Sequence, residues 1–305
     1  MLKTVALRKE YSSVRAVDGV SFVVRPGEVF GLLGPNGAGK TTTIRMVLNI
    51  LRPDAGEVTF DGRPYSPELQ NQIGYLPEER GLYQKNELLS TILYFAQLKG
   101  MPVSDARAKA LRWLEEFQLG SYAQKKVQEL SKGNQQKVQF IIATLHDPRF
   151  VVLDEPFSGL DPVNQIVFKD LLMKLRDQGK VIVFSTHIME QAERLCDTIC
   201  IINRGKVVLD GSLREVKRSY GSNAIHLEFK GDGTFLSHHP AFQSVQVYEN
   251  YAELELRDSS NLNDLFVDLA KRLEIQKFER VEPSLNSIFI RLVSAKSEAL
   301  AGQSA

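Results

Sequence analysis

Nine consecutive residues near the N-terminus have the types and spacing needed to bind phosphate groups. They contain the pattern G-x-x-x-x-G-K-[ST], follow the apolar stretch Val29–Leu33, and are Gly34, Pro35, Asn36, Gly37, Ala38, Gly39, Lys40, Thr41 and Thr42. Their glycines let the backbone bend tightly and approach an anion, while Lys40 adds a full positive charge. The Thr41 hydroxyl can bind Mg²⁺, and a helix starting directly afterwards adds its positive dipole end. The stretch therefore predicts a nucleotide-binding site.

Two other groups of polar residues follow stretches that are typical of central parallel strands. Asp154 and Glu155 come directly after the apolar run Phe150–Leu153, and His187 follows the similar run Val181–Ser185. Ligands of open α/β sheets bind at the carboxyl edge of the strands, so we expect these side chains to meet there.

These side chains could divide the work of hydrolysing a phosphate bond. Asp154 would bind Mg²⁺, Glu155 would hold and partly deprotonate the attacking water, and His187 would bond the γ-phosphate. An acidic pair after a strand is also a common solvated turn, and a single histidine is more often structural. The phosphate-binding pattern upstream favours the functional interpretation of all three.

Two features could complete such a site. Ser131 is a natural N-cap of the helix that follows, and with Gly133 it forms a second anion site, which a second subunit could supply. Tyr11 could stack on a nucleotide base, or it could be an ordinary tyrosine of the surface or of an edge strand. The residues alone leave both alternatives for Tyr11 open.

The spacing of apolar residues predicts the elements that position these groups. A strand over 16–24 is expected to be interrupted by a turn at Asp18–Gly19, with further strands at 57–60 and 72–76. Helices are predicted at 88–98 and 104–117, the second with Ser104 as its N-cap, and they form a helical insertion.

The C-terminal part alternates apolar and polar residues in short segments, which predicts a separate α+β domain, and the order of the segments suggests a ferredoxin-like arrangement. A helix near 212–219 comes before it, and the expected elements are strands at 224–229, 245–248, 252–256 and 276–281 and helices at 262–273 and 284–293. Residues 294–305 are small and polar, so we expect a disordered tail. His238 and His239 are interpreted as a surface loop pair rather than a metal site.

Composition sets limits on the class of protein. The 305 residues carry a net charge of +1, which gives no electrostatic reason to expect a nucleic-acid partner. No apolar run is long enough to span a bilayer, and no secretory signal is visible. Cys196 and Cys200 lie in an apolar context and are expected to be buried, reduced thiols, so we expect a cytosolic protein.

Taken together, these segments resemble the ATPase subunit of an ABC transporter, and they follow the order of that family from Tyr11 to Gly211. By this resemblance Tyr11 is the aromatic residue that stacks on adenine, and Glu155 and His187 are the catalytic glutamate and the switch histidine. The remaining matches are Gly34–Thr42 to Walker A, Glu78 to the Q-loop, Leu130–Asn134 to the signature, Phe150–Glu155 to Walker B and Ser158–Asp161 to the D-loop.

The chain departs from the family pattern in two places. The Q-loop position holds Glu78 instead of glutamine, and a carboxylate ligates Mg²⁺ as readily as an amide oxygen but adds a negative charge. Glu78 could also share the role of the general base. The signature contains Lys132, whose positive charge should help to cap an anion.

The resemblance implies a fold, cofactors and partners. The fold is α/β, a P-loop NTPase (ABC ATPase) core with an antiparallel β subdomain and a helical insertion, plus a small C-terminal α+β domain. The expected boundaries are 1–219 for the ATPase domain, about 85–146 for its helical subdomain, 220–296 for the accessory domain and 297–305 for the tail. The cofactors are ATP and Mg²⁺, with Thr41, Glu78 and Asp154 as metal ligands.

The resemblance also implies a partner subunit. Two copies, or this chain and a homologous ATPase subunit, would close head-to-tail on two ATP molecules, each held by the Lys40 loop of one subunit and by Ser131 and Gly133 of the other. Asp161, in the D-loop match, is also expected to bind the nucleotide. Integral membrane permease subunits would bind the segment after Glu78 and hold the protein on the inner face of the membrane. The C-terminal part resembles the extension of an exporter-type subset, and a regulatory or dimer-stabilising role is a hypothesis.

Two other functions compete with transport. Soluble ABC ATPases of translation or DNA repair carry two ATPase cores or a long coiled-coil insertion, and neither is visible in this sequence. A nucleotide-dependent scaffold without catalysis would not need Glu155 and His187. The permease determines the transported substrate, and the direction suggested by analogy is export.

Overall fold

The computed structural model describes residues 1–12, 14–79, 81–220, 224–257 and 261–301. The chain divides into two compact units, 1–210 and 211–305, and each is described by itself. No helix within these ranges is long and apolar enough to cross a bilayer.

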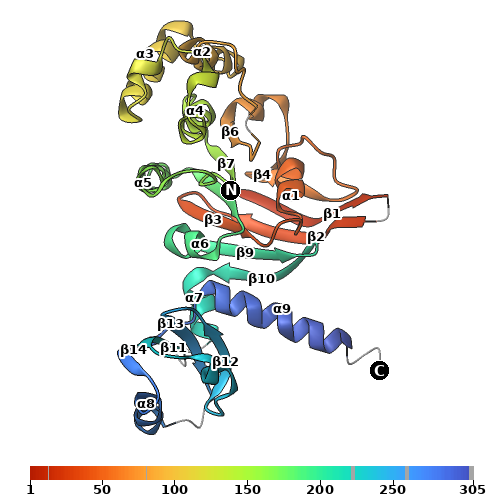
Figure 1. The fold of residues 1–305 in the computed structure, drawn as a ribbon. Coiled ribbons are helices and arrows are strands. Elements are labelled where there is room, and N and C mark those ends of the chain that lie inside the picture. The colour runs from red at the N-terminus through yellow and green to blue at the C-terminus, as the bar shows by residue number, and fades with distance from the viewer. Residues whose placement is uncertain (13, 80, 221–223, 258–260, 302–305) are drawn as a thin grey trace. The chain divides into compact units, whose positions relative to one another are not determined.

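A six-stranded sheet forms the centre of the first unit (Figure 1). Its strand order is β10-β9-β3-β8-β7-β6, with bounds Lys206–Ser212, Thr198–Asn203, Glu28–Leu33, Val181–Thr186, Phe150–Asp154 and Ile73–Leu76. The strands from β9 to β6 are paired in parallel, so their carboxyl ends share one edge. Around them lie α1 (Lys40–Val47), α5 (Pro162–Asp177) and α6 (Met189–Leu195).

A second sheet, antiparallel and of four strands, packs against α1 through its strands β1 and β2. Its order is β2-β1-β4-β5, and the bounds are Val14–Val24, Leu2–Tyr11, Ala55–Phe60 and Arg63–Pro64. The predicted turn at Asp18–Gly19 is wrong, because β2 runs through it. Leu7 pairs with Val20 and Arg8 with Asp18, so Gly19 is the extra residue of a bulge, and its φ of 77° explains why glycine stands there.

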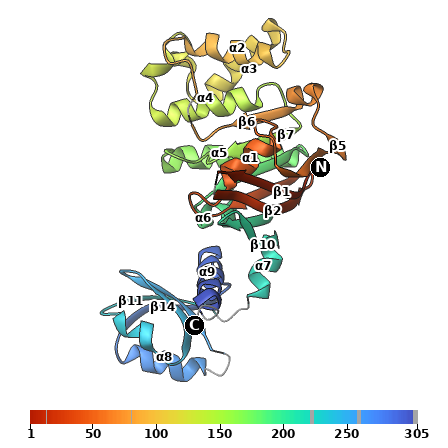
Figure 2. The ribbon, with the colours of Figure 1, turned by 90° about the vertical axis from the view of Figure 1, so that its right-hand side faces the viewer.

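Three helices form the helical part of the first unit: α2 (Leu88–Leu98), α3 (Val103–Glu116) and α4 (Lys132–Thr144) (Figure 2). The 3₁₀ turns of this unit are η1 (Pro67–Gln72), η2 (Gly120–Tyr122) and η3 (Val127–Glu129). The prediction of Ser104 as an N-cap is wrong. Pro102 holds that position, two residues before Ser104, and Ser104 lies inside α3, because the extended backbone of Pro102 comes directly before the first helical residue. Buried rings of Phe117, Phe140 and Phe168 join the three helices α3, α4 and α5.

The second unit contains α7 (Leu213–Ser219) and a four-stranded antiparallel sheet of order β12-β13-β11-β14. The bounds are Ala224–Lys230 for β11, Phe242–Val247 for β12, Tyr251–Leu256 for β13 and Glu274–Val281 for β14, with η4 (Thr234–His238) after β11 and α8 (Leu262–Ala270) before β14. In chain order these strands lie 2-3-1-4, but the short η4 stands where the β-α-β-β-α-β motif of a ferredoxin-like domain has its first helix, so the predicted ferredoxin-like arrangement is met only in part. One face of the sheet carries a closed apolar core that includes Leu227, Leu254 and Leu269.

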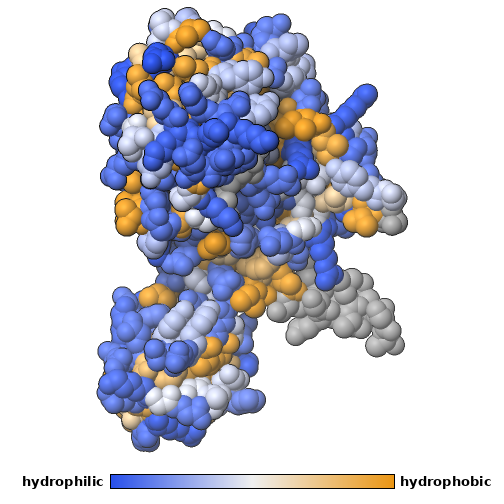
Figure 3. Space-filling view, turned by 45° about the horizontal axis from the view of Figure 1, so that its top comes forward, coloured by the Kyte–Doolittle hydropathy of each residue, from blue (hydrophilic) through white to orange (hydrophobic). Residues whose placement is uncertain are grey.

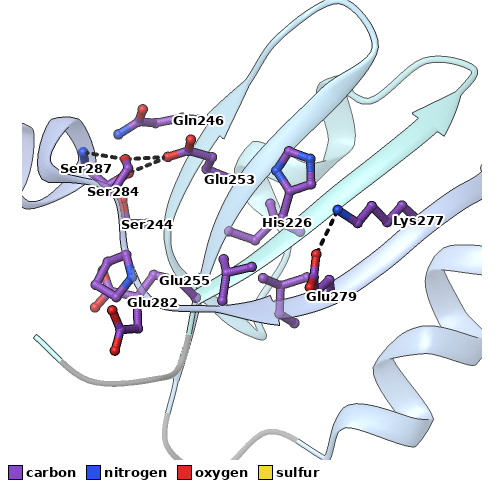
Figure 4. A pocket seen from close by; sticks show the side chains of 15 residues that line it. His226, Ser244, Gln246, Glu253, Glu255, Lys277, Glu279, Glu282, Ser284 and Ser287 are labelled. Carbon is purple, nitrogen blue, oxygen red and sulfur yellow. Dashed lines mark hydrogen bonds and ion pairs between the residues drawn. The ribbon is translucent and has the colours of Figure 1, made fainter. Parts of the chain in front are cut away.

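The last helix, α9, differs from its prediction. It spans Leu285–Ala301, eight residues beyond the predicted end, and the rest of the predicted tail, 302–305, lies outside the described residues. Its start is fixed to β13, since Ser284 and Ser287 both donate hydrogen bonds to Oε2 of Glu253, at 2.8 and 2.6 Å (Figure 4). These residues border a cavity of about 300 Å³ in which the neighbouring Lys277 and Glu279 pair with each other.

Two side-chain predictions have different outcomes. Cys196 and Cys200 are buried free thiols, as predicted, and burial raises the pKa of both. The interpretation of His238 and His239 as a surface pair holds for His238 alone. Nε2 of His239 lies 3.1 Å from Oδ2 of Asp268, and its ring is 13% exposed, because it packs beside Phe242.

The close packing of β6 on α4 depends on Gly74. A Cβ atom there would lie 2.0 Å from the carbonyl oxygen of Ala143, so Gly74→Ala must push the helix away. We expect the variant to lose about 1–3 kcal/mol of unfolding free energy in urea denaturation. Gly81→Ala is the matched control, since a Cβ atom at Gly81 meets nothing within 4 Å. Equal stability of the two variants would contradict this packing.

Candidate nucleotide-binding site

The phosphate-binding stretch has the predicted context, since it joins the end of β3 to the start of α1. Two of its glycines are required by neighbouring strands. A Cβ atom at Gly34 would lie 2.1 Å from the carbonyl oxygen of Ile202, and one at Gly39 would lie 2.4 Å from that of Ala16. The loop is therefore held close between β9 and β2, and its shape exists without a ligand. No acidic residue occupies the first turn of α1, which leaves the positive end of the helix available to an anion.

A cavity of about 230 Å³ opens above this loop. It is lined by residues of the loop and of three other segments: Ala16, Asn36, Gly37, Ala38, Gly39, Lys40, Thr41, Thr42, Glu78 and Glu155. Chain segments that are far apart in the sequence thus meet where a phosphate group would lie. Within this set, Lys40 is the only cation, and it shares the cavity with the carboxylates of Glu78 and Glu155.

Lys40 is 6% exposed and is held inside the loop. Its Nζ donates hydrogen bonds to the carbonyl oxygens of Gly34, at 2.8 Å, and Pro35, at 3.3 Å, and lies 3.5 Å from Oε1 of Glu155. The ammonium group therefore balances the charge of the carboxylate.

Glu155 has a second partner and an uncommon backbone. Its Oε1 lies 2.9 Å from Nδ1 of His187, so the two predicted catalytic side chains are in direct contact. Its φ of 48° is in the left-handed region, and its N–H is anchored to the backbone oxygen and Oγ of Ser185, both at 3.2 Å. The chain turns sharply here, directly after β7, and this turn directs the carboxylate toward Lys40.

Asp154 is fully buried at the end of β7. Burial raises the pKa of its carboxyl group, and hydrogen bonds from the hydroxyls of Ser185 and Thr41 oppose that rise. Oδ2 of Asp154 has no hydrogen-bond partner among the residues that the structure describes. A buried carboxylate oxygen without a partner beside the Thr41 hydroxyl fits a Mg²⁺ ligand set.

Glu78 follows β6 and lines the same cavity, where its carboxylate could complete that set. The described residues contain no group of three or more His, Cys, Asp or Glu side chains that could enclose a metal ion. A cation held by Thr41, Asp154 and Glu78 would therefore take further ligands from phosphate oxygens and water, as Mg²⁺ usually does.

The remaining predicted residues do not line the cavity. Ser131 is the N-cap of α4, as predicted, and its Oγ accepts a hydrogen bond of 3.2 Å from the N–H of Asn134. Asp161 caps α5 in the same way through Asn164. Gly133 is close to Gly159 and Leu160, so the segments around Ser131 and Asp161 lie together but apart from the phosphate loop of this chain.

Tyr11 ends β1 and is 47% exposed. It pairs with Val14, and the same strand β2 carries Ala16 to the cavity wall. Lys9 lies 5.9 Å from the centre of its ring. The stacking role of Tyr11 stays a prediction.

Sequence reasoning missed Ser185. Its hydroxyl donates to Oδ1 of Asp154, and it accepts the N–H of Glu155, so it fixes both predicted functional carboxylates. The signal was present, since Ser185 lies one residue before the end of β8, the strand next to β7, and pairs directly with Asp154 in the parallel register. A polar residue at that edge of the sheet was therefore a candidate from the start.

Family models match both parts of the chain. Residues 17–158 match the model described as "ABC transporter", and residues 211–293 match that described as "ATP-binding protein DrrA1-3-like, C-terminal domain". Together with the phosphate loop and the carboxylates at its strand edge, the first match defines a nucleotide-binding cassette ATPase.

Individual relatives indicate the same class of protein. The chain is 43% identical over 298 residues to "Uncharacterized ABC transporter ATP-binding protein YhaQ" of Bacillus subtilis, covering 98% of this chain and 100% of that protein. It is 41% identical over 211 residues to "Nod factor export ATP-binding protein I" of Burkholderia pseudomallei, covering 68% of this chain and 69% of that one. The chain belongs to the family of ABC transporter ATP-binding proteins, and it is the ATP-binding subunit of such a transporter.

Solved structures support this fold. One described as the ATP-binding subunit of an ABC transporter superposes with a TM-score of 0.68 at 32% identity, over 72% of this chain and 93% of the other. Another, described as the dimeric post-hydrolysis state of an ATP-binding cassette bound to ADP and Pi, gives 0.65 at 26% identity, over 70% and 99%. The predicted fold class is confirmed, and ATP hydrolysis is the activity expected of the family.

The oxygen of Asp154 that has no partner gives a test of the metal site. We expect Asp154→Asn to lose about 10- to 100-fold in Mg²⁺ affinity, because an amide oxygen carries no net charge. Calorimetric titration with ATP, in Mg²⁺ and in EDTA, measures this loss as a smaller effect of the metal on ATP affinity. Asp177→Asn, at the exposed end of α5, should respond to Mg²⁺ as the unmodified chain does. An unchanged Mg²⁺ effect in Asp154→Asn would remove Asp154 from the metal site.

Proposed function

We propose that this subunit hydrolyses ATP to drive export through a separate membrane permease. The 2.9 Å contact of His187 with Glu155, which lines the phosphate cavity, carries the proposal, since it supplies a general base beside a phosphate site. The relatives named for Nod factor export support the direction of transport.

Lys40 and Glu155 exchange partners in the proposed reaction. When phosphate enters the cavity, Lys40 turns from Glu155 to the β- and γ-phosphates, because a phosphate group carries more charge than a carboxylate. Glu155 is then free to accept a proton from the attacking water, while His187 holds its carboxylate in position.

Mg²⁺ fits the residues at the edge of this cavity. Thr41, Asp154 and Glu78 would hold it, and when bound it neutralises charge on the β- and γ-phosphates. Ser185 contributes by fixing Asp154 through its hydroxyl. The loop from Gly34 to Thr42 binds the phosphates through its N–H groups, and Tyr11 stacks on the base.

A second copy of the chain, or a homologous ATPase subunit, completes the site in this proposal. Ser131, Gly133 and Asp161 lie together outside the cavity of their own chain, and two of them cap helices whose N-termini can face an anion. Head-to-tail closure brings them to the ATP of the partner. A solved cassette of the same fold is described as dimeric, which supports this arrangement.

The permease contacts the segment after Glu78 and the helix α2, and it holds the subunit on the inner face of the cell membrane. The net charge of +1 offers no electrostatic attraction to anionic lipid by itself, so attachment through a protein partner is the simpler route. Nucleic acid is not among the proposed partners.

The role of Glu155 predicts an arrested dimer. We expect Glu155→Gln to slow ATP hydrolysis by about 10²- to 10⁴-fold, because the amide cannot accept the proton of the attacking water. ATP should still bind, and the variant should accumulate as an ATP-bound dimer in size-exclusion chromatography with light scattering. Glu190→Gln, an exposed site on α6, is the control. Near-normal phosphate release by Glu155→Gln would contradict the proposed function.

Glu78 is expected to be a metal ligand rather than a base. Glu78→Gln should therefore keep substantial ATPase activity, within about tenfold, since an amide oxygen can still ligate Mg²⁺. Phosphate release as a function of Mg²⁺ concentration measures this ATPase activity. Glu79→Gln is the control, because Glu79 is a neighbour that does not line the cavity. A loss as severe as that of Glu155→Gln would instead make Glu78 a second base.

A further inference from the structure

The helix α4 carries buried polar side chains that the proposed reaction does not use. Hydrophilic side chains cover much of the face of the first unit that Figure 3 shows, where water can satisfy them. Gln136, Lys137 and Gln139 of α4 are instead 1%, 8% and 4% exposed. Each of them donates a hydrogen bond to the backbone carbonyl of a residue 20 or more positions away. Burying a polar side chain is costly unless it is bonded, so these bonds indicate which segments α4 holds in place.

The bond from Gln136 reaches the turn that carries the proposed general base. Nε2 of Gln136 donates to the carbonyl oxygen of Pro156 at 3.1 Å, and Pro156 directly follows Glu155. Because proline has no N–H group, the peptide bond between these two residues cannot donate a hydrogen bond. An anchor at Pro156 must therefore use its carbonyl group, and Gln136 supplies the donor.

The backbone of Glu155 needs such anchors. Its φ of 48° lies in the left-handed region, which a residue other than glycine keeps only when the surrounding structure holds it there. Oγ of Ser185 in β8 accepts the N–H of Glu155 at 3.2 Å, and Gln136 in α4 bonds the carbonyl of the next residue. The turn is thus held between a strand and a helix. Without the bond from Gln136 it can relax, and the carboxylate can leave its position 3.5 Å from Lys40.

Gln136 itself lies outside the nucleotide site. It is not among the residues that line the phosphate cavity, and at 1% exposure its side chain cannot reach ATP or the attacking water. Any effect of this side chain on hydrolysis therefore passes through the turn that it holds.

We propose that Gln136 is a positioning residue for Glu155. Its hydrogen bond to Pro156 maintains the left-handed turn, which keeps the carboxylate where it can accept the proton of the attacking water. The inference rests on the proposed function and adds a residue that acts through the general base. Nucleotide affinity depends on the phosphate loop and Lys40, so Gln136 affects the rate of hydrolysis and leaves the binding of ATP unchanged.

Steady-state ATPase kinetics test this division on the full-length chain. Gln136→Met keeps the length of the side chain and removes the N–H donor. We expect kcat to fall about 10- to 100-fold, because a misplaced base is inefficient, while KM for ATP stays within about twofold. An unchanged kcat, or a change confined to KM, would overturn the proposal.

Thr144→Val on the same helix is the control for lost stability. It also removes a buried hydrogen bond, since Oγ1 of Thr144 donates to the carbonyl of Phe140 at 2.8 Å, but it touches no residue of the phosphate cavity. Unfolding in urea is followed for both variants through Trp113, the one tryptophan of the chain, whose ring centre lies 6.0 Å from that of Phe140. Thr144→Val should keep kcat within about twofold. A loss of kcat as large as that of Gln136→Met would show general damage and overturn the proposal.

A double variant separates positioning of the base from every other role of Gln136. In the Glu155→Gln chain no base is left to position, so adding Gln136→Met should lower the residual single-turnover rate by less than about twofold. A larger additional loss would show that Gln136 acts apart from Glu155 and would overturn the proposal. Gln136→Glu has the same shape without the N–H donor, and it replaces Gln136→Met in these assays if the methionine variant does not fold.

These measurements also distinguish the failure of this inference from the failure of the proposed function. Near-normal hydrolysis by Glu155→Gln alone would contradict the proposed function, whatever Gln136→Met does. Slow hydrolysis by Glu155→Gln together with full activity of Gln136→Met would contradict the positioning role alone and leave the proposed function standing.

Discussion

The rest of the site depends on one pair of opposite charges in a nearly closed space. Lys40 and Glu155 are 6% and 7% exposed and lie 3.5 Å apart, so each compensates the cost of burying the other. Removing either partner would leave an unpaired buried charge. A phosphate group can separate them because it offers Lys40 a stronger partner, and the proton-accepting oxygen of Glu155 becomes available at the same moment. Nucleotide binding and activation of the base are thereby one event in the proposed reaction.

The register of the central sheet makes this pair possible. β3, β8 and β7 are neighbours in parallel, so Leu33 pairs with Thr186 and Asp154 pairs with Ser185. The phosphate loop, His187 and the acidic pair therefore leave the sheet at one edge, and no long connection is needed to bring them together. A slip of one residue in β7 would turn Asp154 to the other face of the sheet and break its bond to Ser185.

The sequence predicted the parts of the site whose structure is determined by a local pattern of residues. The glycine-rich loop, the two strand-end groups and the cap at Ser131 were found because each depends on residues close together in the chain. The bulge at Gly19 was missed because it depends on how β2 pairs with β1, and an Asp-Gly pair favours a turn just as well. The buried, unpaired atoms of Gln139 and His146 in the described part of the chain were out of reach for the same reason, because both residues look like ordinary polar positions of a helix and its end.

Gln139 connects α4 with the segment beside the phosphate cavity. Its Nε2 donates a hydrogen bond to the backbone carbonyl of Glu79, next to Glu78, which lines that cavity. The same helix α4 has its N-cap at Ser131, the residue proposed to meet the ATP of the partner subunit. One hydrogen bond and one helix therefore join the two segments of this chain that are proposed to contact the two ATP molecules of the closed dimer.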